Sequence, residues 1–498
     1  MITLRTLGER RPDRSTRHGS TRLTGALVAI AALGTLVGTL VGAVASDPAV
    51  AAHGGSAGAA GNYGSAISTP RVDSYYPAHG NDVVDALHYG LDLTWHPHKR
   101  SLSGTERLVF RAAKDADAIP LDLSNALTVT SAAVDGHAVR ATRSTDHLSL
   151  PVAITAGQVH TVTLSYAGVP RPVAAPGTRS DESVLGFISK RDGRAYAMQE
   201  PYGAFTWYAV NDQPADKALY DFSLHVPAPY VGIANGRLTH RHTGHGVTTT
   251  RWHLASPAAS YLTTIAFGNY QQTRLGKVHG TPLSYWTPTD RPELVSWLRF
   301  MAKDFRWLEH LLGPYPFDTL SLVVVPSKSA METQTMISEG DTRGALDEQD
   351  VVHEMSHQWY GDQVTPNDWR DVWMSEGMAM YVQYRWLDHV GGYRTGTWVD
   401  TETSRYDATY LSEYGPMGAY NPADFASSNV YLPPARMWWT LSKMLGKARF
   451  DDLLRRWPAS HPHSSQSREA LEDWWSAASG RDLHPFFQRW LSATRDPS

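Results

Sequence analysis

Two histidines stand four positions apart in the segment VVHEMSHQWYGD, residues 351–362, and a glutamate directly follows the first of them. On a helix, positions i and i+4 lie on one face, so His353 and His357 would point the same way. Neutral imidazole nitrogens at that separation can both bind one Zn²⁺ ion. Glu354 would project beside the ion, where a carboxylate can act as a base on water. The spacing constrains the fold, because a catalytic zinc site needs a third protein ligand from elsewhere in the chain.

The flanking residues predict a helix around this pair and a second helix that completes the ligand set. Asp347 is a suitable N-terminal cap and Gly361 a suitable stop for the first helix. The next helix is predicted over DVWMSEGMAMYVQYRWLDHVGG, with Ser375 as a candidate cap and Glu376 in its first turn. A carboxylate from this helix would complete a His₂Glu set and leave the fourth position for water. The alternative is a solvated helix with incidental histidines.

The composition narrows the kinds of site that this chain can carry. It contains no cysteine, which excludes disulfides and thiolate metal sites and leaves His, Asp and Glu as ligands. Its 498 residues are enough for two or three domains. The net charge is −4, and nothing in the composition suggests a nucleic-acid partner, which would call for clustered Lys and Arg.

The N-terminal segment has the features of an export signal. Residues 1–45 begin with a basic stretch and continue in the uncharged run from Thr24 to Ala45, which ends in a small-x-small pattern. We expect a cleaved signal peptide or, if it stays uncleaved, a membrane anchor. Both place the following domains in a secreted or extracytoplasmic location. Residues 46–80 are rich in Gly, Ala and Ser and are expected to form a flexible linker.

Two folded regions with different periodicities follow this linker. Residues 81–270 consist of short segments that alternate apolar and polar residues, which predicts an N-terminal antiparallel β-sandwich-like domain. Asp-Gly at 135–136 suits a tight hairpin turn. Residues 271–498 show mainly helical spacing, with a further strand in DTLSLVVVPS. The predicted fold class is multidomain α+β, with a mainly helical C-terminal half.

The segment HEMSHQWYGDQVTPNDWRDVWMSEG resembles the zinc signature of the aminopeptidase N-like metallopeptidases, the gluzincins of peptidase family M1. The resemblance covers roughly residues 80–495, without the family's large C-terminal helical domain, so a short form is expected. It implies a thermolysin-like α/β catalytic domain with one Zn²⁺ per chain. By the same resemblance, Glu354 is the general base, and the zinc ligands are His353, His357 and Glu376.

The segment SAMETQT, residues 329–335, resembles the family's Gly-x-Met-Glu-Asn motif, whose glutamate binds the substrate N-terminus. Ser329 replaces the Gly of that motif and Thr333 replaces its Asn, which removes a possible hydrogen bond to the substrate backbone. Glu332 keeps the charge that recognises an amine. The substrate-binding residues implied by this motif are Ala330, Met331 and Glu332.

Two further residues occupy positions that the family uses. Glu200 stands where the family has a Gln or Glu that contacts the substrate amine, although a structural contact between domains is the alternative. Tyr431 precedes a predicted helix with prolines in its first turn, and it resembles the family's donor to the oxyanion. The family's Lys-Gly after this tyrosine is absent. Competing tyrosines lie nearby, at Tyr406, Tyr410, Tyr414 and Tyr420.

These features predict an exported zinc aminopeptidase that acts on peptides with a free N-terminus. A zinc endopeptidase, or a hydrolase of another small substrate on the same site, is the nearest alternative. A non-catalytic binding module on a peptidase scaffold is an alternative of a different class. Neither the preferred first residue nor the oligomeric state can be read from the pattern, and membrane contact is expected only if the N-terminal segment stays uncleaved.

Overall fold

The structure is a computed structural model, and the residues it describes belong to one compact unit. The predicted signal segment, residues 1–45, and the first part of the predicted linker, residues 46–62, lie outside the described residues. Among the residues that are described, no helix combines the length and the apolar character that crossing a bilayer requires. The described residues are 63–177, 183–392, 394, 396, 399, 404–495 and 497.

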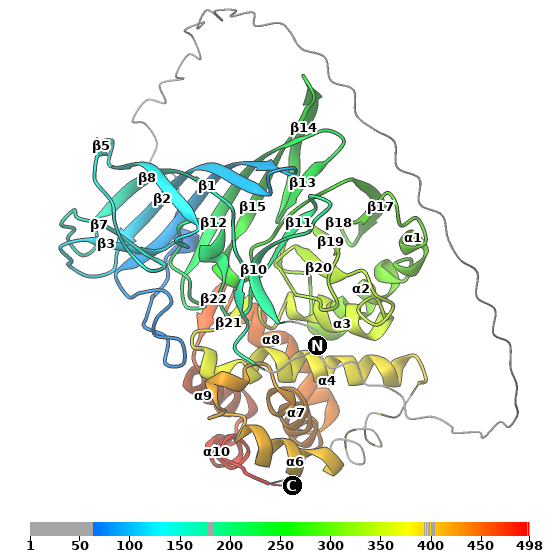
Figure 1. Ribbon diagram of the computed structural model, residues 1–498. Helices are drawn as coiled ribbons and strands as arrows, with labels where there is room; N and C mark the ends of the chain where they lie inside the picture. The colour runs from blue at the N-terminus through cyan, green and yellow to red at the C-terminus, as the bar shows by residue number, and fades with distance from the viewer. Residues whose placement is uncertain are drawn as a thin grey trace, which may run out of the picture. The chain divides into compact units, whose positions relative to one another are not determined.

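The N-terminal region is built on an eight-stranded sheet with the strand order β14-β15-β12-β1-β2-β8-β4-β5 (Figure 1). Its strands are β1 (Val84–His96), β2 (Ser101–Ala112), β4 (Leu127–Val134), β5 (His137–Ala138), β8 (Val159–Gly168), β12 (Lys217–Pro227), β14 (Arg237–Gly244) and β15 (Val247–Ala259). The alternation predicted from the sequence is present, since Leu91, Leu93 and Trp95 are buried while Asp92 is exposed. One pair differs from the predicted antiparallel arrangement, because β1 and β12 run parallel. The long stretch of chain between these two strands makes a parallel crossover possible.

Smaller sheets pack against this one and complete the sandwich-like core. The five-stranded sheet has the order β13-β16-β11-β10-β9 and comprises β9 (Val173–Ala174), β10 (Val184–Ser189), β11 (Ala195–Met198), β13 (Val231–Ala234) and β16 (Ile265–Gly268). A three-stranded sheet has the order β3-β7-β6 and comprises β3 (Ile119–Asp122), β6 (Thr142–Ser144) and β7 (His147–Leu150). Trp95 of β1 contacts Phe187 of β10 and Phe267 of β16, with ring centroids 5.1 and 6.0 Å away. The predicted hairpin is confirmed at Asp135 and Gly136, which have φ angles of 50° and 81° between β4 and β5.

A four-stranded sheet begins the second region, with the order β17-β18-β19-β20. Its strands are β17 (Tyr270–Val278), β18 (Thr281–Pro288), β19 (Leu320–Val325) and β20 (Met336–Gly340). The last three run parallel, and β19 is buried along its whole length, as its unbroken apolar sequence predicts. Helices α1 (Leu294–Trp297) and α2 (Met301–Leu312) precede β19, and α2 ends before Gly313 at a positive φ of 98°.

The remaining elements are mainly helical (Figure 1). They are α3 (Glu348–His357), η4 (Trp369–Asp371), α4 (Trp373–His389), α6 (Ser404–Tyr414), η6 (Pro422–Asp424), η7 (Ser428–Val430), α7 (Leu432–Leu445), α8 (Lys447–Ser460), α9 (Arg468–Ser479) and α10 (His484–Leu491), with a short strand pair of β21 (Val364–Pro366) and β22 (Ser464–Gln466). Helix α4 begins before the predicted cap, and the Ser375 hydroxyl donates to the carbonyl of Val372 within its first turn. Helices α4 and α7 approach closely at Gly377, where an added Cβ would lie 2.4 Å from the Cβ of Pro434.

Residues 68–76, here called the strap, are hydrogen-bonded to both regions, unlike the flexible linker expected up to residue 80. The backbone N–H of Ser68 donates to Asp85 of β1 at 2.9 Å. The hydroxyl of Ser74 donates to Asp368 at 2.6 Å, and that of Tyr76 donates to the carbonyl of Pro422 at 2.7 Å. The Gly- and Ala-rich composition ends before the strap, whose polar and aromatic side chains supply these contacts.

Candidate active site

The three predicted ligands meet between helices α3 and α4. The Nε2 atoms of His353 and His357 lie 3.3 and 3.5 Å from the same carboxylate oxygen of Glu376. These separations match the edge of a tetrahedron with metal bonds of 2.0–2.1 Å, which is about 3.3 Å. All three side chains are buried. Two imidazoles and a carboxylate converging at these distances fit a zinc ion.

The second nitrogen of each imidazole is held by a group beyond the ligands. Nδ1–H of His357 donates to the carbonyl of Tyr360 at 3.0 Å, and Nδ1–H of His353 donates to Oε1 of Gln383 at 3.1 Å. Such bonds fix the ring orientation and leave Nε2 for a metal. Gln383 lies two turns after Glu376 on α4, and its contact with His353 was not predicted from the sequence.

The electrostatics of the site favour a bound cation. Burial opposes protonation of His357, but the carboxylates of Glu332 and Glu376 outweigh it and raise its pKa to about 10. Burial also opposes ionisation of Glu376, yet the nearby imidazoles hold the pKa of this carboxyl well below its ordinary value. The surplus of acidic groups around the imidazoles therefore attracts positive charge.

Glu354 and Glu332 face the imidazole of His357. A carboxylate oxygen of each and a ring nitrogen of His357 all lie within 4.8 Å of one another. Burial and, after it, the charge of Glu332 raise the pKa of Glu354 well above its ordinary value. The residue predicted as general base is therefore next to the ligand set and next to the predicted amine anchor.

The second predicted anchor, Glu200, lies close to Glu332. Oxygens of Glu200, Glu332 and Glu376 lie within 4.8 Å of one another, which places two additional carboxylates beside a metal ligand. Glu200 follows strand β11, so the N-terminal region contributes directly to this site. The carboxylate cluster can bind one ammonium group through charge-assisted hydrogen bonds.

The segment that carries Glu332 is hydrogen-bonded to β20. The backbone N–H of Met331 donates to the carbonyl of Ser338 at 2.8 Å, and the N–H of Ser338 donates back at 2.9 Å. Ala330 lies just before this bridge and is half-buried. Thr333, which replaces the family's Asn, donates its hydroxyl to the carbonyl of Met336, so its side chain is used within the turn.

Tyr431 lies beside the ligand set, directly before α7. Its ring is stacked on that of His353, with centroids 6.2 Å apart and an angle of 29° between the planes. Among its competitors, Tyr420 donates its hydroxyl to the carbonyl of Trp369, and the ring of Tyr410 lies beside that of Tyr414. The side chain of Tyr406 lies outside the described residues.

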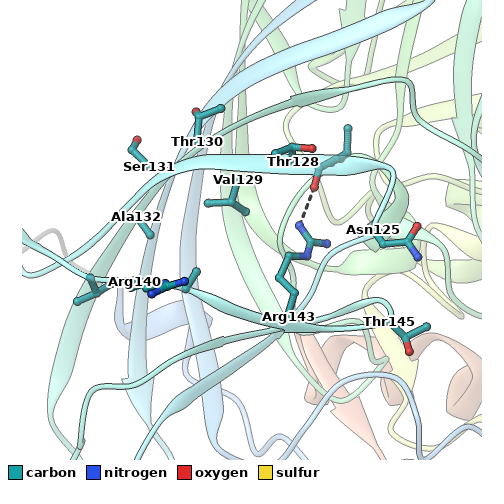
Figure 2. A pocket seen from close by; sticks show the side chains of 12 residues that line it. Asn125, Thr128, Val129, Thr130, Ser131, Ala132, Arg140, Arg143 and Thr145 are labelled. Carbon is teal, nitrogen blue, oxygen red and sulfur yellow. Dashed lines mark hydrogen bonds between the residues drawn. The ribbon is translucent and has the colours of Figure 1, made fainter.

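A cavity of about 500 Å³ lies away from these residues, on the N-terminal region (Figure 2). It runs along β4 and the segment that follows β5, and its lining includes Thr128, Thr130 and Arg140. Arg143 also lines it and donates to the carbonyl of Leu127 at 2.6 Å. The cavity contains none of the predicted site residues.

Comparison with known proteins finds similarity to the same family that the motifs resemble. Residues 298–490 match the sequence profile of the peptidase family M1 domain. The chain is 25% identical over 345 residues to aminopeptidase N of Acetobacter pasteurianus, covering 64% of this chain and 95% of that protein. A solved structure, a two-domain M1 zinc metallopeptidase variant bound to L-arginine, superimposes with a TM-score of 0.77 at 25% identity, covering 86% of this chain and 98% of that one. The predicted fold class is confirmed, and the family implies a Zn²⁺ cofactor.

Other relatives are much longer than the region they share with this chain. Aminopeptidase M1-B of Oryza sativa subsp. japonica is 24% identical over 311 residues, which cover 56% of this chain. That match spans only 34% of the plant protein.

Proposed function

We propose that this chain, an aminopeptidase N-like gluzincin with a peptidase family M1 domain, is a zinc aminopeptidase that hydrolyses the first peptide bond of its substrates. The observation that carries this proposal is the position of Glu332 and Glu200 beside the ligand Glu376. The α-nitrogen and the carbonyl carbon of one residue are only about 2.5 Å apart. An ammonium held by these carboxylates therefore presents the carbonyl of its own residue to the ligand set, and cleavage falls after residue one.

The chain's own side chains provide the remaining chemistry. When bound, zinc polarises the scissile carbonyl and lowers the pKa of a water molecule. Glu354 takes a proton from the attacking water and returns it to the leaving amine. The Tyr431 hydroxyl donates a hydrogen bond to the developing oxyanion, while Glu332 and Glu200 hold the substrate's ammonium.

Comparing a free peptide with its N-acetylated twin tests the proposal. An aminopeptidase cleaves the free peptide and leaves the acetylated one intact, because acetylation removes the positive charge. Equal cleavage of both would favour the endopeptidase alternative. A protein that binds one zinc per chain, yet cleaves neither peptide nor a panel of aminoacyl amides, would be a binding module.

Export is part of the proposal and is supported by the sequence of residues 1–45. The uncharged run and its small-x-small end suit removal by signal peptidase. N-terminal sequencing of the protein recovered outside the cytoplasm would test this. A mature chain that begins near residue 46 supports cleavage, while an intact N-terminus in the membrane fraction supports an anchor.

A further inference from the structure

Gln358, the residue after the ligand His357, connects the metal-binding helix to the segment that carries the amine anchor Glu332. Its Nε2 donates to the carbonyl of Glu332 at 2.9 Å and to Oδ2 of Asp362 at 2.6 Å. Its Oε1 accepts from the backbone N–H of Thr335 at 3.0 Å and from the hydroxyl of Tyr315 at 3.0 Å. The side chain is fully buried, and both amide protons and both acceptor positions are used.

These bonds hold the turn formed by residues 332–335 in a strained backbone conformation. Thr335 has a positive φ of 64°, which is unfavourable for a residue with a branched side chain. Its N–H is held by Gln358, and the carbonyl of Glu332 is held by the same amide group. The side chain of Gln358 therefore holds both ends of the turn 332–335, and its own backbone is adjacent to His357.

The same network continues into the N-terminal region. Asp362, which accepts from Gln358, is also held through its backbone carbonyl by the ammonium of Lys217 at 2.7 Å. Lys217 is the first residue of strand β12 and is buried. Helix α3, the turn 332–335 and the N-terminal region thus meet at one polar cluster, with Gln358 at its centre.

We propose that Gln358 is a positioning residue that sets the spacing between the amine anchor Glu332 and the metal ligands. This inference rests on the proposed aminopeptidase function. The substrate's ammonium and its scissile carbonyl are a fixed distance apart. Productive binding therefore requires a matching distance between the Glu332 carboxylate and the metal ligands. A misplacement of 1 Å can lower a rate by roughly 100-fold. Gln358 therefore contributes to selecting the first peptide bond without touching the substrate.

The test compares Gln358→Met with the matched control Gln334→Met, both in the full chain loaded with zinc. Gln334 is equally buried and lies two residues from Glu332, but its Nε2 donates to the carbonyls of Ser256 and Pro257 in β15 instead of to α3. We expect Gln358→Met to raise KM for unblocked aminoacyl amides by about tenfold or more and to reduce the preference for a free over an N-acetylated peptide. We expect Gln334→Met to change neither by more than about twofold.

Zinc content and thermal unfolding show whether each variant is folded and loaded. A loaded Gln358→Met enzyme with the parental KM and amine preference would overturn the proposal, as would equal losses in the control. If Gln358→Met does not fold, Tyr315→Phe removes one partner of Gln358 and keeps the ring. We expect it to raise KM about threefold at an unchanged kcat, and an unchanged KM would overturn the proposal. If the parent itself cleaves free and acetylated peptides equally, the aminopeptidase function fails whatever the variants do.

Discussion

Among the described residues, two histidines and one carboxylate come together between α3 and α4 and again on the eight-stranded sheet, and the two settings differ. In the group between α3 and α4, His353 and His357 approach one oxygen of Glu376 from two directions. The helix spacing of four residues aligns the imidazoles, and the second helix brings the carboxylate across their open side. Burial then removes competing water, so the three groups define one point where a cation fits.

The second group lies on the outer face of the eight-stranded sheet. His88 of β1 lies 2.9 Å from one oxygen of Asp221 of β12, and His253 of β15 lies 2.7 Å from the other oxygen. Asp221 and His253 are half-exposed. Each imidazole here contacts a different oxygen of Asp221, so the group consists of two separate pairs side by side across three strands. Residue types alone therefore do not make a metal site; convergence and burial do.

Removing one imidazole from each group should separate them most strongly. We expect His353→Ala to lose stoichiometric zinc and nearly all peptidase activity, because two ligands hold a zinc ion poorly. The matched change His88→Ala should keep one zinc per chain and the parental activity. Elemental analysis and an aminoacyl amide assay measure both. Zinc loss in His88→Ala would show that the outer group contributes to metal binding.

The next largest effect concerns the carboxylates beside the helical group. We expect Glu332→Ala to raise KM and to lower kcat/KM for unblocked aminoacyl substrates by about 10- to 100-fold, the value of one or two hydrogen bonds to a charged group. Zinc content should not change, because Glu332 is outside the ligand set. A variant that cleaves free substrates as well as the parent would contradict the role of this residue as the amine anchor.

An effect of intermediate size is expected for Lys217, a buried residue whose Nζ donates to the carbonyls of Asp362 and Gln363. Burial lowers its pKa to about 7, despite the opposing charge of Asp362. In the unfolded chain this amine keeps its proton to a pH of about 10.4. The unfolded state therefore binds more protons between these values, and stability rises with pH by up to about 1.4 kcal/mol per unit.

Lys217→Met should lack this rise. Urea unfolding of parent and variant at pH 6, 7, 8 and 9 measures the difference in their free energies of unfolding. We expect that difference to move in favour of the parent above pH 7 and to stay constant below it. Parallel pH profiles would show that the ammonium stays charged in the folded protein.

The smallest effect is expected for the outer group itself. Hydrogen bonds from His88 and then His253 lower the pKa of Asp221 below its ordinary value, against the effect of burial. The stabilisation is therefore present above that pKa and is lost as the pH falls through it. Because the group is half-exposed, Asp221→Asn should cost at most about 0.5–1 kcal/mol. Thermal unfolding of parent and variant should show this difference at pH 8 and a smaller one at a pH below the pKa of Asp221.

The sequence predicted the parts of the site that depend on local spacing. The ligand pair follows from the helical period, and the third ligand follows from a second segment with apolar residues at helical spacing, although Ser375 is not where that helix begins. Glu332 and Glu200 are predicted only through the family resemblance, because nothing in their local pattern indicates that segments about 130 residues apart meet beside Glu376.

The groups that hold the site in place could not be predicted in this way. Gln358 and Gln383 act through contacts with other elements, and glutamines on a buried helix face carry no distinctive pattern. The parallel pairing of β1 with β12 is likewise a non-local choice, because both strands show the same alternation as their antiparallel neighbours. The contacts of the strap were not predicted, because its residues show no apolar periodicity and the flexible linker was expected to extend to residue 80.

The strap determines where this protein can be shortened for laboratory use. Asp73 accepts a hydrogen bond at 2.8 Å from the backbone of Trp369, in the short helix just before α4. A shortened protein that starts at β1 would contain every strand of the sheets. It would still lack the hydrogen bond to Asp73 that holds the short helix before α4, the helix that carries Glu376. Trimmed versions should therefore begin before Ser68, and affinity tags belong further upstream.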